Sequence, residues 1–192
     1  MSVIVPVPAN KSPATVEDLL ALPEDLRVEL IGGEIVEKAA PDFDHGECQL
    51  ALGAGLFPMS RPADHRTGWW LGSEVDVLYG PNDLYRHDVV GWRRDRVGER
   101  PKGRPVTIRP DWVCEILSPS NWRNDTVSKF RVLQQTGVPH YWLLDLEHGQ
   151  LTVLRWQDGS YAIAAVAVAG EKARLEPFEE IELELALLFG QT

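Results

Sequence analysis

The sequence predicts a mixed α/β fold in which helices cover a central β-sheet. The stretch from Asp111 to Asp145 contains an apolar run, a helical segment and a second apolar run. Such a strand–helix–strand unit makes its two strands parallel through a right-handed crossover. Two dipeptides, Gly32-Gly33 and Asp158-Gly159, separate pairs of apolar runs in the way that β-hairpin turns do. The sheet is therefore expected to combine parallel and antiparallel strands.

The first third of the chain is expected to contain two helices on either side of a hairpin. Residues 15–18 resemble a capping box and predict a short helix over 16–21 that Pro23 ends. The alternating run VELIGGEIVE follows as the hairpin. Residues 41–62 predict a loop that leads into a second helix, with Asp44 as its N-cap. Its expected apolar face consists of Leu50, Leu52, Leu56 and Phe57.

The remaining elements are mostly strands. Two are expected at 69–79 and 86–92, joined by the turn residues 80–83. After Asp145, two further strands at 151–156 and 161–168 form a hairpin, and 177–188 predicts a last strand with a short helical end. The Pro-rich residues 1–13 lack periodicity and are expected to form an extended arm, with one domain over 14–192.

The composition is that of an ordinary globular protein, with 44% hydrophobic and 25% charged residues in 192. The two cysteines, Cys48 and Cys114, form neither a disulfide framework nor a CxxC motif, which favours a reducing compartment such as the cytoplasm. The sequence shows no signal peptide and no apolar stretch that would span a bilayer, so no membrane association is expected.

The formal charge of −10 argues against a nucleic-acid-binding protein, but the charges are unevenly distributed. The C-terminal part is rich in glutamate, whereas basic residues concentrate in one short segment: Arg86, His87, Arg93, Arg94, Arg96, Arg100, Lys102, Arg104 and Arg109. This segment is compatible with contact to phosphates and equally with a solvated loop.

Two carboxylates lie within otherwise apolar runs and are the main candidates for chemistry. Asp88 follows His87 at the start of one expected strand, and Glu115 lies inside another. If the strands are neighbours, the two acids repel each other unless a cation lies between them. Mg²⁺ binds such carboxylates and a substrate phosphate together. Lys129, on the following helix, would add an ammonium group, which completes a minimal phosphodiester-cleaving site.

A purely structural interpretation of the same residues is open. Glu115 would then form a buried ion pair with Arg123 or Lys129, and Asp88 would face solvent at a strand entry. Glu29 and Glu34 flank the hairpin turn, where surface charge is the ordinary role. His45 and Cys48 have a short spacing, but a metal site needs more ligands than this pair supplies.

Five sequence motifs, in this order, resemble the Uma-two family of restriction-endonuclease-like proteins. They are VELIGGEIVE, HDVVGW, DWVCEILSPS, the helix with Asp125 and Lys129, and TGVPHYWLLD. The resemblance covers roughly residues 15–156. It implies the PD-(D/E)XK nuclease fold, a mixed central sheet flanked by helices, here with additional antiparallel hairpins.

The resemblance also implies roles for particular residues. Asp88 matches the acid of the PD motif, although His87 replaces the proline. Glu115 matches the acid of the (D/E)XK motif. The lysine expected two residues later is replaced by Leu117, and Lys129 on the helix matches instead. Glu29 is similar to an early acid of the superfamily.

The expected protein is therefore a Mg²⁺-dependent endonuclease that acts on DNA, with Mn²⁺ as a possible substitute. Asp88, Glu115 and the carbonyl of Ile116 would bind the metal, and Lys129 and Glu29 would complete the catalytic set. Supporting residues would be Asp125, Glu34 and Arg123, and contacts to nucleic acid would come from Arg93, Arg94, Arg96 and Trp122. A homodimer is expected, because two sites cut two strands more readily. The alternative is a non-catalytic interaction or DNA-associated protein that keeps the fold.

Overall fold

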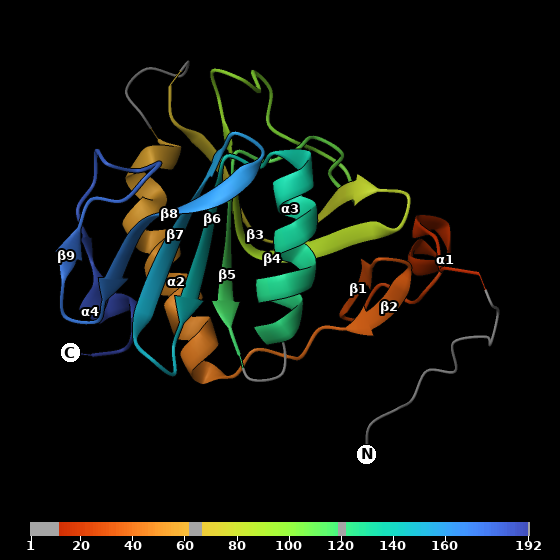
Figure 1. Cartoon of the computed structure of the whole chain (residues 1–192), viewed down its shortest axis with the longest axis horizontal. Helices are drawn as coiled ribbons and strands as arrows, with labels where there is room; N and C mark the ends of the chain where they lie inside the picture. Colours follow the sequence, from red (N-terminus) through yellow and green to blue (C-terminus); the bar gives the residue numbers. More distant parts are fainter. Residues whose placement is uncertain (1–11, 62–66, 119–121, 192) are drawn as a thin grey trace.

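The computed structural model describes residues 12–61, 67–118 and 122–191 and contains an eight-stranded sheet (Figure 1). The residues of the expected arm before residue 12 lie outside this range. The strands are β1 Val28–Ile31, β2 Glu34–Glu37, β3 Trp69–Gly80, β4 Asp83–Arg93, β5 Trp112–Leu117, β6 His140–Asp145, β7 Gln150–Gln157 and β8 Ser160–Val168. The helices are α1 Val16–Leu20, α2 Phe43–Ser60, the π-helix η1 Asn124–Lys129, α3 Phe130–Thr136 and α4 Leu185–Leu188. A small second sheet pairs β9 Lys172–Ala173 with β10 Leu183–Glu184.

The order of strands confirms the predicted mixed α/β sheet. It runs β2-β1-β4-β5-β6-β7-β8, with β3 paired to β4 outside this path. Strands β5 and β6 are parallel and are connected through η1 and α3, whereas the other neighbours are antiparallel. Both hairpin predictions are correct, at Gly32-Gly33 between β1 and β2 and at Asp158-Gly159 between β7 and β8.

Helices cover both faces of the sheet (Figure 1). Trp112, Cys114 and Ile116 of β5 belong to the core that α2 and α4 complete. Val113 belongs to the opposite core, which includes Leu133 of α3. Because side chains alternate along a strand, Glu115 lies on the Val113 side, beneath the η1–α3 segment. The sequence thus places one carboxylate in the apolar layer between the sheet and this helical segment.

Two predictions about α2 were wrong. The N-cap is Asp42 rather than Asp44, because the Asp42 carboxylate accepts the His45 N–H at 2.9 Å. Leu50 and Phe57 are 75% and 57% exposed rather than buried. The buried stripe consists of His45, Cys48, Leu52 and Leu56, which recur at intervals of three and four. Leu50 and Phe57 fall outside this stripe, so apolar character alone misassigned them.

Within 177–188 the predicted strand is only the two-residue β10 at 183–184, whereas the predicted helical end is present as α4. The predictions for α1 and the cysteines agree with the structure. The capping box of α1 is present, with reciprocal hydrogen bonds between Thr15 and Asp18. Cys48 and Cys114 are both buried free thiols. Among the described residues, none of the helices combines the length and apolar character needed to cross a membrane.

Candidate active site

Four elements bring the four predicted catalytic residues into one buried cluster. Glu29 comes from β1, Asp88 from β4, Glu115 from β5 and Lys129 from η1, and each is at most 4% exposed. Strands β1, β4 and β5 are adjacent in the sheet, so residues far apart in sequence become neighbours. The sheet order therefore creates the cluster.

Lys129 is the centre of one half of the cluster. Its Nζ lies 2.9 Å from Glu29 Oε1, 3.1 Å from Glu115 Oε1 and 2.9 Å from Asp125 Oδ1. An ammonium has three protons, so these three carboxylates use its full donor capacity. The π-helix η1 supplies both Asp125 and Lys129, and the Tyr141 hydroxyl donates to the Asp125 carbonyl at 2.8 Å. Such π-helical turns occur frequently at functional sites.

Asp88 is the centre of the other half. The backbone pairing of β4 with β5 extends as far as Val89 and Cys114. Beyond this pair, the Asp88 carboxylate takes the place of a backbone carbonyl as the hydrogen-bond acceptor for β5. Its Oδ2 accepts the Ile116 N–H at 2.7 Å, and its Oδ1 accepts a hydrogen bond from Lys38 Nζ at 2.7 Å. Lys38 Nζ also lies 3.9 Å from Glu115 Oε2. Asp88 and Glu115 therefore converge on a single ammonium group.

A buried histidine orients Glu115. The Nδ1 atom of His87 lies 2.6 Å from Glu115 Oε1, and its Nε2 lies 2.7 Å from the Tyr79 hydroxyl. Burial, followed by the nearby Lys129 charge, lowers the pKa of His87 well below its usual value. A neutral ring that donates through Nδ1 accepts the Tyr79 hydroxyl at Nε2, so both ring nitrogens are used. Glu115 Oε2, in contrast, is buried without a hydrogen-bond partner among the described residues.

The carboxylates titrate differently according to their partners. Burial raises the pKa of Glu115 to about 8 and that of Asp125 to about 7, against the opposing pull of Lys129. Burial acts on Asp88 too, but Lys38 and His45 hold its pKa below the usual value. Glu29 also has a lowered pKa, because Lys129 and Lys38 outweigh its burial. Neighbouring acids in one cluster thus prefer different protonation states.

The charge of the cluster fits a divalent cation. Four buried carboxylates, those of Glu29, Asp88, Glu115 and Asp125, face two buried ammonium groups, those of Lys38 and Lys129. When all are ionised, two negative charges remain uncompensated in a buried site, which is costly. A divalent cation supplies the missing charge, and Glu115 Oε2, which accepts no hydrogen bond from the described part of the chain, is a suitable ligand for it.

Sequence reasoning missed four members of this site. They are Lys38, His45, Glu74 and His87. His45 lies on α2, with its Nε2 3.4 Å from Asp88 Oδ1. One ligand atom from each of His45, Glu74 and Asp88 lies within 4.8 Å of the others. For Glu74 the structure gives a signal that sequence lacks: its φ is 53°, a left-handed conformation that costs a non-glycine residue about 1–2 kcal/mol.

The other predicted residues lie in three places. Asp125 joins the cluster, and Ile116 reaches it through the N–H that Asp88 accepts. Glu34 is exposed at the start of β2, and Arg123 is exposed at the N-terminal end of η1.

The predicted arginines are at the opposite end of β5 from Leu117 and are engaged in structural contacts. Arg93 pairs with Asp95, and Arg96 pairs with Asp111, the residue that precedes β5. Arg94 stacks on the Trp70 ring at 3.8 Å. Of the residues proposed to contact nucleic acid, only Trp122 lies near the cluster.

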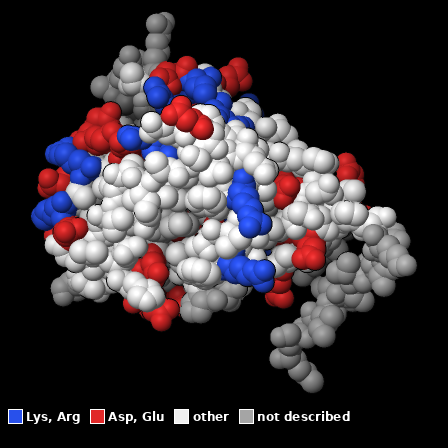
Figure 2. Space-filling model, viewed as in Figure 1, with Lys and Arg blue, Asp and Glu red and all other residues white. Residues whose placement is uncertain are grey.

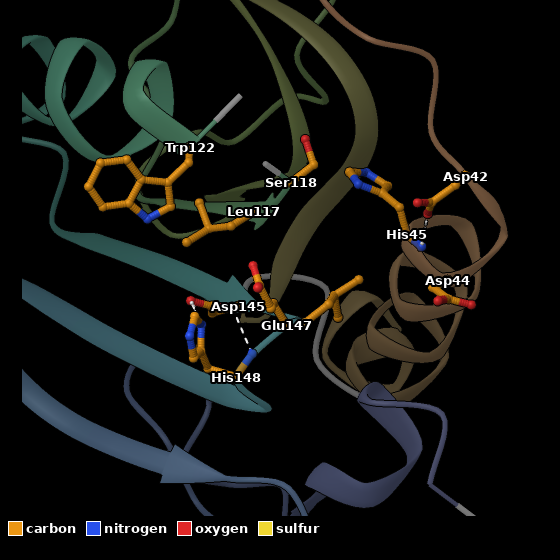
Figure 3. A pocket seen from close by; sticks show the side chains of 10 residues that line it. Asp42, Asp44, His45, Leu117, Ser118, Trp122, Asp145, Glu147 and His148 are labelled. Atoms are coloured by element: carbon orange, nitrogen blue, oxygen red, sulfur yellow. Dashed lines mark hydrogen bonds and ion pairs between the residues drawn. The ribbon is translucent and has the colours of Figure 1, made fainter. Parts of the chain in front are cut away.

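A pocket of about 450 Å³ is separated from the cluster by His45, which forms part of its wall (Figure 3). His45 lines this pocket and also contacts Asp88, so it connects the open space with the buried site. Trp122 is 53% exposed at the same pocket, as expected from sequence. Four acidic residues also line the wall, together with Ser118, His148 and two leucines: Asp42, Asp44, Asp145, Glu147, Leu117 and Leu146. On the face seen in Figure 2, basic and acidic side chains are interspersed and no broad basic surface is present.

Comparisons with known proteins agree with the fold and identify the family. No curated protein matches the chain. A crystal structure described as "a putative nuclease belonging to DUF820 from Anabaena variabilis ATCC 29413" shares the fold, with a TM-score of 0.75 and 22% identity. The match covers 93% of this chain and 99% of that chain. The model of the Uma2 family, described as "Putative restriction endonuclease", matches residues 16–187. That match spans most of the sequence, and the chain therefore belongs to the Uma2 family.

Proposed function

We propose that this protein is a Mg²⁺-dependent endonuclease that hydrolyses phosphodiester bonds in DNA. The observation that carries the proposal is the convergence of Asp88 and Glu115, from adjacent strands, within 4 Å of the single ammonium of Lys38. Membership of a family described as "Putative restriction endonuclease" supports the reaction class. The cluster holds four carboxyl groups against two ammonium groups, and a divalent cation would stabilise the ionised forms of Glu115 and Asp125.

Asp88 and Glu115 would hold the metal, with the Ile116 carbonyl as the third predicted ligand. A bound divalent ion stabilises the charge that develops on a phosphate and lowers the pKa of a coordinated water. Lys129 compensates the negative charge around Glu115 and keeps that carboxylate in place, since it bridges three acids. Glu29 and Asp125 fix the Lys129 ammonium, and His87 fixes the orientation of Glu115.

Substrate would approach through the pocket that His45 and Trp122 line. An exposed tryptophan stacks on unpaired bases regardless of their identity. The acidic residues of the wall repel the phosphates of either DNA form, so Trp122 is the feature of this entrance that favours a single-stranded segment. The buried free cysteines suit a reducing compartment such as the cytoplasm, and a homodimer would bring two such sites to one duplex.

The test is cleavage of supercoiled plasmid and of single-stranded DNA with Mg²⁺ or Mn²⁺. Wild type is expected to cleave, and Glu115→Gln, which keeps the size of the side chain, is expected to lose activity by at least roughly 100-fold. His148→Gln changes an exposed residue of the pocket and is the matched control. Activity that persists in Glu115→Gln would come from a contaminant and would refute the proposed site.

A non-catalytic interaction protein is the second candidate. The acid-lined pocket favours it, because such a surface attracts a basic partner rather than a nucleic acid. Absence of cleavage with every metal and both DNA forms, in a folded protein, would favour this candidate.

A further inference from the structure

Two buried histidines near the cluster differ in one respect. Both ring nitrogens of His87 have partners, Glu115 and Tyr79. His45 is only 8% exposed, yet its Nε2 has no hydrogen-bond partner among the described residues. The contact of that atom with Asp88 Oδ1, at 3.4 Å, is an ion pair only if the ring is protonated. A buried imidazole nitrogen without a hydrogen bond is an available metal ligand.

Glu74 provides a second available atom. One carboxylate oxygen, Oε2, pairs with Arg27 at 2.9 Å. The other, Oε1, is buried without a hydrogen-bond partner among the described residues. The left-handed backbone of Glu74, within β3, persists even though it is unfavourable for a glutamate. Glu74 also lies opposite Asp88, since Ser73 pairs with Val89 and Val75 pairs with His87.

We propose that His45, Glu74 and Asp88 form a site for a divalent transition-metal ion that binds Mn²⁺ in preference to Mg²⁺. Ligand atoms of all three residues lie within 4.8 Å of one another, which allows one ion to contact all of them. The site adjoins the proposed nuclease centre, because Asp88 belongs to both. The binding itself rests on these three side chains and requires no cleavage of DNA.

The donor set determines the preference among metals. One imidazole nitrogen with two carboxylate oxygens suits Mn²⁺ and the later transition metals, whereas Mg²⁺ strongly prefers oxygen and retains its water. Lys38 and Arg27 remain paired with Asp88 and Glu74 and reduce the negative charge around the ion. The preference for Mn²⁺ over Mg²⁺ therefore comes from the imidazole ligand and not from the net charge of the site.

The experiment measures Mn²⁺ binding by electron paramagnetic resonance in the absence of DNA. Wild type is expected to bind Mn²⁺ and to show nitrogen modulation in electron spin echo spectra, the signature of a directly bound imidazole. His45→Gln should lose this modulation and bind Mn²⁺ at least roughly 10-fold more weakly. Glu74→Gln should weaken binding while it keeps the modulation. His148→Gln removes an exposed histidine of the same pocket and should bind as wild type does.

Competition with Mg²⁺ tests the selectivity, and Mg²⁺ should displace Mn²⁺ only at an excess of more than roughly 10-fold. The inference is overturned if wild type binds no Mn²⁺, binds it without nitrogen modulation, or gives Mg²⁺ equal affinity. Unchanged binding in both His45→Gln and Glu74→Gln overturns it as well. If circular dichroism shows that His45→Gln does not fold, two other measurements test the proposal: the nitrogen modulation of the wild type and the Mn²⁺ affinity of Glu74→Gln.

The two proposals fail separately. Nitrogen-bound Mn²⁺ in a protein that cleaves no DNA supports the metal site and refutes the nuclease. Mg²⁺-dependent cleavage that requires Glu115 supports the nuclease. If Mn²⁺ binding in the same protein is independent of His45, the metal site is refuted.

Discussion

Lys38 Nζ lies 2.7 Å from Asp88 Oδ1, and both side chains are almost completely buried. The ammonium also donates to the Arg86 carbonyl at 2.6 Å and faces Glu115 at 3.9 Å. Lys38 is thus a permanent counter-cation for the two carboxylates proposed to bind metal. This arrangement gives the protein stability without a metal, and it makes stability and metal affinity interdependent.

Replacement of Lys38 by methionine should lower the free energy of unfolding by about 3 kcal/mol, because it leaves a buried carboxylate without its partner. Addition of Mn²⁺ should recover part of this loss, and the stabilisation by Mn²⁺ should exceed that of wild type. Urea unfolding with and without the metal measures both effects. Arg93→Met is the control, since its pair with Asp95 is more than half exposed and contributes at most about 1 kcal/mol. Equal losses in the two variants would contradict the buried role of Lys38.

Lys129→Met should be more severe, with a loss on the order of 4 kcal/mol, since three buried carboxylates lose their common ammonium. A double variant that adds Asp125→Asn should recover part of that loss, because one of the repelling charges is removed. Thermal unfolding of the single and double variants checks this coupling. Additive losses would show that Lys129 and Asp125 do not interact energetically.

The stability of the protein should depend on the ionisation of Asp125, whose pKa burial raises to about 7. The folded state retains this proton at a pH where the unfolded chain has lost it, so unfolding releases a proton. The stabilising effect is complete below the unfolded pKa, about 3.9, and is lost as the pH rises through about 7.

The stability of wild type relative to Asp125→Asn should therefore fall by about 4 kcal/mol between pH 4 and pH 8. Urea unfolding of both proteins across this range measures the difference, in which other titrating groups largely cancel. A difference that stays constant, or that rises with pH, would show that Lys129 keeps Asp125 ionised throughout.

A comparison of Glu74→Gly with Glu74→Ala separates two contributions of Glu74 to stability, that of its backbone conformation and that of its side-chain contacts. Both variants lose the ion pair with Arg27, but only glycine adopts a φ of 53° without steric penalty. The glycine variant should be more stable than the alanine variant by about 1 kcal/mol. Denaturant midpoints of the two variants measure this difference. An alanine variant of equal or greater stability would mean that the strand relaxes at this position.

The sequence by itself determined the local structure and half of the site. Hairpin turns, the capping box and the strand–helix–strand unit follow from local patterns, and these predictions were correct. Asp88 and Glu115 could be identified because an acid within an apolar strand is costly to bury and therefore needs a partner. Lys129 was identified by its position on the helix that follows Glu115, and the family resemblance added Glu29. The structure places both in the same cluster.

Only the tertiary structure decided which residues complete the cluster. Lys38 follows an edge strand, His45 lies on the buried stripe of an amphipathic helix, and Glu74 lies on a long strand with its backbone in an unusual conformation. The periodicity of α2 indicates that His45 is buried, but no local pattern assigns any of these three residues to the site, because their role depends on the distance to Asp88 in the folded chain. Local sequence patterns indicate which face of a helix or strand is buried. Contacts between elements that are distant in sequence depend on the order of the strands in the sheet, which local patterns do not determine.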